Sequence, residues 1–264
     1  MKIPCVLAIA GSDSCGGAGI QADIKTIQGL GARALTALTA LTAQNSRGIR
    51  GIHAVPPEFI VEQVDAVLED LTPDAVKVGM VFTAGAVKAV AGLIERYMLR
   101  NVVLDPLLRA STGRDLLEPE AWGLLKARLL PLARVITPNL TEAGVLLGRE
   151  IINLEGAVQG ARKLKSLGPD VVVTGGHLQG GPVDVLYSGD TLRTYPGDRI
   201  EERETHGSGC VFSSALAVFL GAGWELPEAV GAAGECTRQA IRGSVLTRPD
   251  VSRKSYADIE ACEE

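Results

Sequence analysis

The sequence predicts an α/β fold in which helices cover both faces of a mostly parallel sheet. Short apolar runs alternate with segments of helical periodicity, and each run is followed at once by Gly, Pro, Asp or Asn. Buried parallel strands are continuously apolar because both of their faces are covered, and alternating strands and helices are typical of βαβ units. With 264 residues, 46% of them hydrophobic, the chain is expected to form a single domain over 1–264, with no prediction for the tail beyond about 245.

Five apolar runs are the predicted parallel strands. They are Cys5–Ala10, Ala75–Val78, Val102–Leu104, Arg134–Thr137 and Val171–Thr174. Alternating apolar residues over Asp184–Tyr195 predict a hairpin that adds small antiparallel strands at one edge of the sheet. The segment Thr36–Ala43 repeats Thr-Ala-Leu with a period of three, which matches neither a strand nor a helix, so no element is predicted there.

Helices are predicted where apolar residues recur on one face. The helical periods that begin at Ile60, Val87 and Leu226 each define such a face. Pro57 and Pro227 lie near the first helical position of two of these segments, where proline is favoured. In a sheet covered by such helices, ligands bind beyond the carboxyl ends of the strands, and the polar and glycine residues of this chain concentrate there.

The composition excludes several classes of function. The net charge is −5 without a basic tract and aromatic residues make up 4%, so a nucleic-acid partner is not expected. No apolar run is long enough to span a bilayer, and Cys5–Ala10 is too short for a signal segment, so no membrane partner is expected either. The five cysteines include no CxxC pair and there are only three histidines, which suggests neither a disulfide framework nor a zinc site. A cytoplasmic protein is expected.

The most informative stretch is Thr205–Ser214, T-H-G-S-G-C-V-F-S-S. Gly207, Ser208 and Gly209 form a loop with little side chain, and the helical spacing of the apolar residues that follow predicts that this loop opens a helix. Unpaired N–H groups and the helix dipole favour an anion there, and the same field is expected to lower the pKa of the Cys210 thiol. The alternative is a glycine-rich turn before a core helix with a buried cysteine.

A second glycine-rich loop, Gly11–Ala22, follows the first predicted strand. Residues 17–22 match the dinucleotide fingerprint G-x-G-x-x-A, but no acid occurs between Asp23 and Glu58 to hold a ribose, so NAD is disfavoured. Gly17 stands where a phosphate-binding P-loop has its lysine, which excludes that motif. Asp23 is interpreted either as a charge at the start of a helix or as a carboxylate aimed at a polar ligand.

Asn139 and Glu142 form an N-x-x-E pattern at a strand-to-helix junction. By itself this pattern favours a capping box, in which each side chain satisfies the backbone of the other. A glutamate beyond a strand end also has the chemistry to hold Mg²⁺. The residues alone leave both interpretations open.

Seven motifs occur together and in order: A-G-S-D-S-x-G-G-A-G-I-Q-A-D-I-K at 10–25, T-A-Q-N-S-R-G at 42–48, V-G-M at 78–80, L-D-P at 104–106, I-T-P-N-L-T-E-A at 136–143, G-G-H at 175–177 and T-H-G-S-G-C at 205–210. Over roughly residues 3–245 the chain closely resembles the hydroxymethylpyrimidine/phosphomethylpyrimidine kinase family of thiamine biosynthesis, within the ribokinase-like superfamily. The resemblance implies a three-layer α/β/α fold and a homodimer. It also implies the use of ATP and Mg²⁺ to phosphorylate 4-amino-5-hydroxymethyl-2-methylpyrimidine and then its monophosphate.

The resemblance also implies roles for individual residues. The anion hole and catalytic group would be Gly207, Ser208, Gly209 and Cys210, with Cys210 in place of the aspartate base of many superfamily members. The pyrimidine pocket would contain Gly11, Asp23, Gln44 and Met80. ATP would contact Asn139, Thr174 and Gly176, and the metal ion would lie near Glu142 and Asp105. Physically, an amide such as Gln44 offers both a donor and an acceptor to an aminopyrimidine edge, and Met80 suits a flat ring.

Three features depart from the family pattern. Thr174 stands where relatives commonly have lysine, a change that affects one ATP-phosphate contact. Ser208 replaces the more usual threonine, and the family's Gly/His/Pro-rich ending is missing. Two other functions compete with the pyrimidine kinase: a pyridoxal or pyridoxine kinase, whose substrate also carries a hydroxymethyl group, and a binder of the pyrimidine without catalysis. Ligand-dependent ATP consumption would separate an enzyme from a binder.

Overall fold

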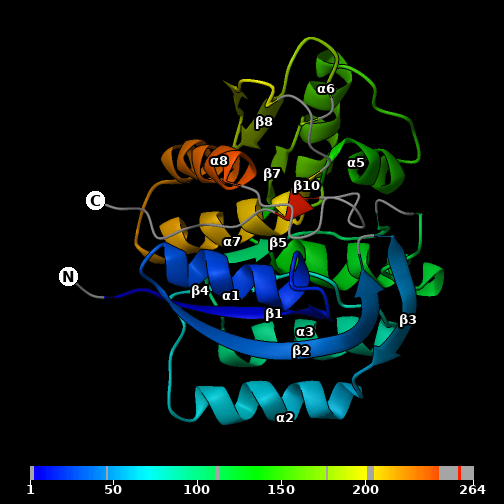
Figure 1. Ribbon diagram of the computed structural model, residues 1–264, viewed down its shortest axis with the longest axis vertical. Coiled ribbons are helices and arrows are strands. Elements are labelled where there is room, and N and C mark those ends of the chain that lie inside the picture. Colours follow the sequence, from blue (N-terminus) through cyan, green and yellow to red (C-terminus); the bar gives the residue numbers. More distant parts are fainter. Residues whose placement is uncertain are drawn as a thin grey trace.

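The computed structural model describes residues 3–45, 47–110, 113–176, 178–200, 205–243 and 255–256. These residues form one nine-stranded sheet in the order β3-β2-β1-β4-β5-β6-β7-β8-β9, with helices on both faces (Figure 1). Strands β1, β2 and β4 to β7 pair in parallel, whereas β3 and the hairpin β8–β9 pair antiparallel at the two edges. The predicted three-layer α/β/α fold with an antiparallel edge hairpin is confirmed.

Five strands of the sheet follow the predicted apolar runs and two form the predicted hairpin, whereas β2 and β3 match no predicted run. Their bounds are β1 Cys5–Asp13, β2 Arg33–Asn45, β3 Gly48–Ala54, β4 Ala75–Val78, β5 Val102–Leu104, β6 Val135–Ile136, β7 Asp170–Val173, β8 Val183–Ser188 and β9 Thr191–Pro196. Two further short strands pair with each other in parallel, β10 Thr205–His206 and β11 Ser255–Tyr256. His177 and nearly all of the chain end beyond 243 lie outside the described residues.

The helices divide between the two faces of the sheet. Their bounds are α1 Gly19–Gly29, α2 Pro57–Leu68, α3 Ala84–Tyr97, η1 Pro119–Ala121, α4 Trp122–Leu124, η2 Leu125–Leu129, η3 Leu130–Leu132, α5 Leu140–Leu147, α6 Leu154–Lys165, α7 Ser208–Gly221 and α8 Leu226–Arg242. Figure 1 shows α1, α7 and α8 on one face, with α2 and α3 on the other. Helices α5 and α6 pack on the same face as α2 and α3. Across the described residues, no helix combines the length and apolar character needed to cross a membrane.

The core has two layers, one on each side of the sheet. Along β1, Leu7 and Ile9 face the layer of α2 and α3, while Val6, Ala8 and Ala10 face the layer of α1, α7 and α8. All five residues are fully buried. Because a strand alternates its side chains between two covered faces, every position must be apolar, which explains why the run is continuous.

The long strand β2 is the main element that sequence periodicity missed. It pairs in parallel with β1 through Arg33–Leu38 and antiparallel with β3 through Ala40–Asn45. Leu35, Ala37 and Thr39 are buried at alternate positions, which is a strand period of two. The three-residue Thr-Ala-Leu repeat hides this period because small and polar residues fall on both faces of the strand.

Candidate active site

The carboxyl ends of the parallel strands meet along one edge of the sheet. Met80, Asp105, Asn139 and Thr174 lie just beyond strands β4, β5, β6 and β7. Gly11 lies near the end of β1, where the register with β2 shifts between Ala10 and Ser12. The fold therefore brings most of the predicted site residues to the position where open α/β sheets bind ligands.

The glycine loop before α7 packs directly against the backbone of the first loop. Gly207 has φ of +92°, and a Cβ at this position would lie 1.8 Å from the Gly17 carbonyl oxygen. Only glycine fits such an approach. Ser208 then begins α7, whose 14 residues leave unpaired N–H groups at its start. The structure thus places the start of a helix, with its unpaired N–H groups, beside the loop that follows β1.

Cys210 lies in the first turn of α7 and is only 4% exposed. Burial raises the pKa of its thiol to about 12, even though the charge of Lys77 acts in the opposite direction. The expectation that the helix terminus lowers this pKa is therefore wrong. The cost of burying a thiolate, increased by the nearby carboxyl groups of Asp23 and Asp105, exceeds the stabilisation that the helix dipole and Lys77 offer, so the thiol is protonated at neutral pH.

Asp105 is a buried carboxyl group beside the start of α7, and Glu142 is a second buried carboxyl group that is affected by its charge. Asp105 accepts a hydrogen bond from Ser213 Oγ at 3.2 Å, and a Cβ on Gly209 would lie 3.9 Å from the same carboxylate oxygen. Burial raises the pKa of Asp105 to about 6. Burial and the negative charge of Asp105 together raise the pKa of Glu142 well above its ordinary value. The charge of Asp105 thus makes ionisation of Glu142 harder, a situation that a bound cation would relieve.

Asn139 and Glu142 form a complete capping box at the start of α5. Asn139 Oδ1 accepts a hydrogen bond from the Glu142 N–H at 2.9 Å, and Glu142 Oε2 accepts one from the Asn139 N–H at 2.9 Å. The other carboxylate oxygen, Glu142 Oε1, is buried without a hydrogen-bond partner. The two sequence interpretations are compatible, because one oxygen caps the helix while the second remains available to a metal ion.

Thr174 and Gly176 lie next to this capping box. Thr174 pairs with Asn139 in a parallel bridge, and its N–H donates to the Pro138 carbonyl at 3.0 Å. The neighbouring Gly175 N–H donates to Asp184 Oδ1 at 2.9 Å. Around Gly176 the space that a side chain would occupy is open within 4 Å. The segment therefore exposes backbone rather than side chains toward the edge of the sheet.

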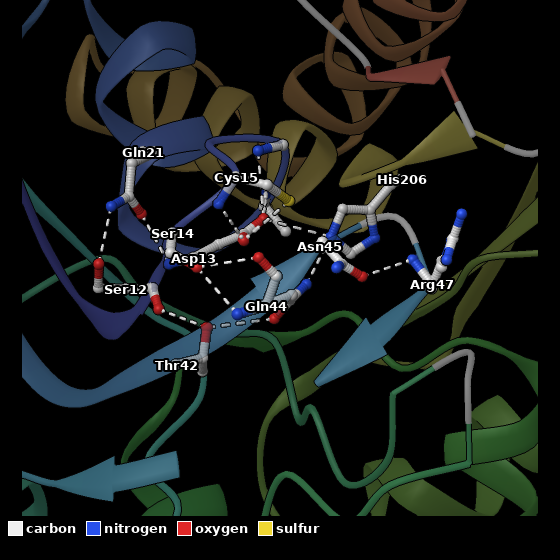
Figure 2. A network of polar contacts seen from close by, with 12 residues as sticks. Ser12, Asp13, Ser14, Cys15, Gln21, Thr42, Gln44, Asn45, Arg47 and His206 are labelled. Carbon is white, nitrogen blue, oxygen red and sulfur yellow. Dashed lines mark hydrogen bonds and ion pairs between the residues drawn. The ribbon is translucent and has the colours of Figure 1, made fainter. Parts of the chain in front are cut away.

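Of the residues predicted for the pyrimidine pocket, Gly11 and Met80 contact each other, and Gln44 belongs to a network of polar side chains. A Cβ on Gly11 would lie 2.9 Å from the sulfur of Met80, so these two residues touch. Gln44 Nε2 lies 2.9 Å from His206 Nε2, and its Oε1 accepts a hydrogen bond from Thr42 at 3.3 Å (Figure 2). Because His206 directly precedes Gly207, the network joins the predicted pocket to the anion hole.

Comparison with known proteins places the chain in a family. The family model of phosphomethylpyrimidine kinase matches residues 13–252. The chain belongs to this family. It is 45% identical over 238 residues to the hydroxymethylpyrimidine/phosphomethylpyrimidine kinase of Rhizobium meliloti (strain 1021), which covers 89% of each protein. It is 46% identical over 239 residues to the thiamine biosynthesis bifunctional protein ThiED of Geobacter sulfurreducens, covering 90% of this chain and 49% of that longer protein.

A solved structure extends the comparison to three dimensions. An ADP complex of Bacillus subtilis pyridoxal kinase superposes with a TM-score of 0.87 at 36% identity, covering 97% of this chain and 98% of the other. The predicted family and its ribokinase-like fold are thereby confirmed, and the protein is a kinase.

In this kinase Asp23 does not face an open pocket. Its side chain is fully buried, and Oδ1 lies 2.7 Å from Lys77 Nζ and accepts a hydrogen bond from Ser214 at 2.9 Å. Burial alone would lower the pKa of Lys77, but the nearby acidic groups, Asp23 first and then Cys210 and Asp105, together raise it. The structure therefore makes Asp23 the partner of a buried cation beneath the α7 terminus, rather than a carboxylate that reaches a ligand directly.

Sequence reasoning missed three residues that shape the site. Lys77 is a single charge within the apolar strand Ala75–Val78, which was the available signal that it has a buried partner. Asp13 is 3% exposed and accepts N–H groups from the loop that follows β1. His206 contacts both Asp13 and Gln44, a juxtaposition of residues more than 160 positions apart that no local pattern indicates.

Proposed function

We propose that the chain catalyses ATP-dependent phosphorylation of the hydroxymethyl group of 4-amino-5-hydroxymethyl-2-methylpyrimidine and then of the resulting monophosphate. The observation that carries this proposal is the buried carboxyl pair Asp105 and Glu142, of which Asp105 adjoins the start of α7. Phosphoryl transfer needs a divalent cation and N–H donors around the moving phosphoryl group. The carboxyl pair and the N–H groups at the helix start are the groups that would supply them. The similarity to a kinase solved with ADP supports ATP as the donor.

The residues present fit Mg²⁺. Asp105 and Glu142 supply hard carboxylate oxygens, and Glu142 Oε1 is buried without a protein partner. When bound, Mg²⁺ would neutralise charge on the phosphate oxygens. The capping box holds Glu142 in place through its second oxygen, and Thr174 pairs with Asn139 of the same box.

The anion hole is proposed to stabilise the transferring phosphoryl group through backbone N–H groups of Gly207, Ser208, Gly209 and Cys210. These donors are fixed by the helix, so they are aligned before the reaction begins. The Cys210 thiol is protonated in the free protein. We propose that it loses this proton to solvent when substrate binding changes its surroundings, and that the resulting thiolate then accepts the hydroxyl proton of the substrate. Lys77 beneath it favours that charge.

The predicted pocket favours an aminopyrimidine. Gln44 presents an amide, which both donates and accepts, and Met80 contacts Gly11 where a flat ring would pack. Pyridoxal is a second candidate substrate, because a pyridoxal kinase shares the fold over nearly the whole chain. That ring also carries a hydroxymethyl group.

The proposal is tested by ADP release from the full chain with hydroxymethylpyrimidine, its monophosphate, pyridoxine and pyridoxal as alternative substrates. We expect the highest kcat/KM for the two pyrimidines, with turnover that depends on Mg²⁺. A higher kcat/KM for pyridoxal would replace the pyrimidine assignment with a pyridoxal kinase. Absence of ligand-dependent ADP release with tight pyrimidine binding would make the protein a non-catalytic binder.

A further inference from the structure

Asp13, Cys15 and His206 bring three kinds of metal-binding side chain together at the rim of the predicted pocket (Figure 2). Cys15 Sγ lies 3.1 Å from Asp13 Oδ1, and His206 Nε2 lies 3.3 Å from Asp13 Oδ2. The three ligand atoms all lie within 4.8 Å of one another. Ligands of a tetrahedral Zn²⁺, at about 2.0–2.3 Å from the ion, are about 3.3–3.8 Å apart. Because the two short contacts involve different oxygens of Asp13, small side-chain rotations would bring the three ligand atoms around one ion.

The Asp13 carboxylate has room for one more ligand. Backbone N–H groups of Cys15, Gly17 and Ala18 donate to it at 3.0, 3.1 and 2.9 Å. Gly17 and Ala18 donate to Oδ2, which His206 Nε2 also contacts at 3.3 Å. On Oδ1 the Cys15 N–H takes one of the two lone pairs, and the Cys15 thiol now uses the other, which is the position open to an ion. The same donors fix the carboxylate in the loop, and this rigidity is what a metal site requires.

His206 Nε2 lies between two polar groups, the Asp13 carboxylate at 3.3 Å and the Gln44 side-chain amide at 2.9 Å. With the amide oxygen of Gln44 turned toward the imidazole, a proton on Nε2 serves both neighbours. A cation bound through the lone pair of Nε2 would replace that proton and so change what His206 offers to Gln44.

We propose that Asp13, Cys15 and His206 form a binding site for a thiophilic divalent cation of the Zn²⁺ class. The Cys15 thiol releases its proton to solvent on binding, and its thiolate, the neutral imidazole Nε2 and one carboxylate oxygen donate to the ion, with water as a fourth ligand. The ion is neither oxidised nor reduced. Sulfur and imidazole ligands distinguish this site from the all-oxygen pair Asp105 and Glu142, which suits Mg²⁺.

The proposed ion would also act on the pocket. Coordination uses the lone pair of His206 Nε2, so the Gln44 amide would lose its contact with that nitrogen. Gln44 is the residue proposed to read the pyrimidine edge. Ion binding is therefore expected to weaken pyrimidine binding, and this second claim rests on the proposed function, whereas the ion site itself does not.

The site is tested first by binding alone, with Co²⁺ as a spectroscopic substitute for Zn²⁺ added to the full chain under reducing conditions. We expect a thiolate-to-cobalt charge-transfer band that Zn²⁺ displaces. Cys15→Ser should abolish the band and weaken Zn²⁺ binding by more than the roughly 10–100-fold that loss of an outer-shell partner costs. Cys236→Ser, the same change at another half-buried thiol, should leave the band unchanged. A wild-type protein without the band, or a band that survives in Cys15→Ser, would overturn the site.

The coupling is tested by kinetics at saturating Mg²⁺ and ATP. Zn²⁺ should raise the KM for the pyrimidine in the wild-type protein and not in Cys15→Ser, whose activity without Zn²⁺ should be normal. An equal effect in both proteins would overturn the coupling. If the protein phosphorylates no pyrimidine, the cobalt spectra still decide the ion site, so the two failures can be told apart.

Discussion

At the scale of single residues, Gln44 is the side chain whose contacts depend most on what occupies the pocket. Its Nε2 contacts His206 and its Oε1 accepts from Thr42, so both ends of the amide are held at the rim of the site. We expect Gln44→Ala to reduce kcat/KM for the pyrimidine by the equivalent of about 1–3 kcal/mol, because the polar edge of the substrate is left unpaired. The KM for ATP should change far less.

Gln63→Ala is the matched control for this prediction. Gln63 also has an amide side chain, but it lies in α2 and contacts the backbone of Leu38 in β2. Its Oε1 accepts from the Leu38 N–H at 2.9 Å, and its Nε2 donates to the Leu38 carbonyl at 3.0 Å. Its loss should lower stability without changing the KM for the pyrimidine. Equal pyrimidine kinetics in Gln44→Ala and the wild-type protein would remove Gln44 from the pocket.

The protonated state of Cys210 leads to a second prediction at this scale. Because burial raises its pKa to about 12, we expect the free protein to resist alkylation of Cys210 by iodoacetamide at pH 7. The half-buried Cys5 and Cys236 should react first, as peptide mass spectrometry would show. Rapid, selective modification of Cys210 at pH 7 would show instead that the helix terminus holds a thiolate.

At the scale of elements, the two carboxylate oxygens of Glu142 at the start of α5 have different surroundings. Glu142 caps the helix with Oε2 and leaves Oε1 without a partner. Glu142→Gln keeps an oxygen for the cap but removes the negative charge. We therefore expect a higher Mg²⁺ concentration for half-maximal activity, with a melting temperature close to that of the wild-type protein.

Asn153→Ala provides the contrasting control. Asn153 caps α6 by accepting the Gly156 N–H at 2.8 Å, away from the acid pair. Its loss should cost about 0.5–2 kcal/mol of stability with an unchanged Mg²⁺ titration. If Glu142→Gln behaved like Asn153→Ala, the glutamate would be a cap and nothing more.

How much of the molecule can be predicted from sequence differs between elements. The short strands β4 and β5 have the predicted bounds, because a strand buried on both faces must be apolar throughout. Strand β2 could not be predicted, since its Thr and Ala residues fit a covered surface only when β1 and β3 are already in place.

The candidate site divides in the same way. Motif order indicates Cys210 and Glu142 and their positions at helix starts, because these are local features. Burial raises the pKa of Cys210, and Asp23 pairs with Lys77, which lies 54 residues further along the chain. Both features therefore depend on the assembled layers. Sequence therefore locates the groups, whereas the packing of the layers determines their ionisation.

At the scale of the whole molecule, Lys77 and Asp23 join the sheet to the helix layer. Lys77 comes from β4 and Asp23 from α1, and both side chains are fully buried. We expect Lys77→Met to cost about 3–5 kcal/mol of unfolding free energy, because a carboxylate is left buried without its cation. Adding Asp23→Leu should recover much of this loss.

The surface pair Arg128 and Glu95 serves as the control in chemical denaturation. Its atoms lie 3.4 Å apart and about half of each side chain is exposed, so Arg128→Met should change stability by no more than about 1 kcal/mol. If Lys77→Met were equally mild, the buried pair would not be ionised as we describe.

The pH dependence of Mg²⁺ binding tests the acid pair through the stability of the entire fold. The pKa of Asp105 rises from 3.8 to about 6 on folding, so the folded protein holds a proton that the unfolded chain has already lost. Binding of this proton therefore stabilises the folded state fully below about pH 4, and the stabilisation is lost as the pH rises through 6. Mg²⁺ binds the ionised form, so it competes with that proton.

We therefore expect the gain in melting temperature on adding Mg²⁺ to be small at pH 5 and to increase through pH 6 toward pH 7, since Asp105 titrates near 6. The raised pKa of Glu142 extends the increase to higher pH. Asp105→Asn should flatten the pH dependence, because the amide neither binds the proton nor attracts the cation. A Mg²⁺ effect that is already full at pH 5 would mean that the metal ion is held elsewhere, since a protonated Asp105 cannot contribute a negative charge to its site.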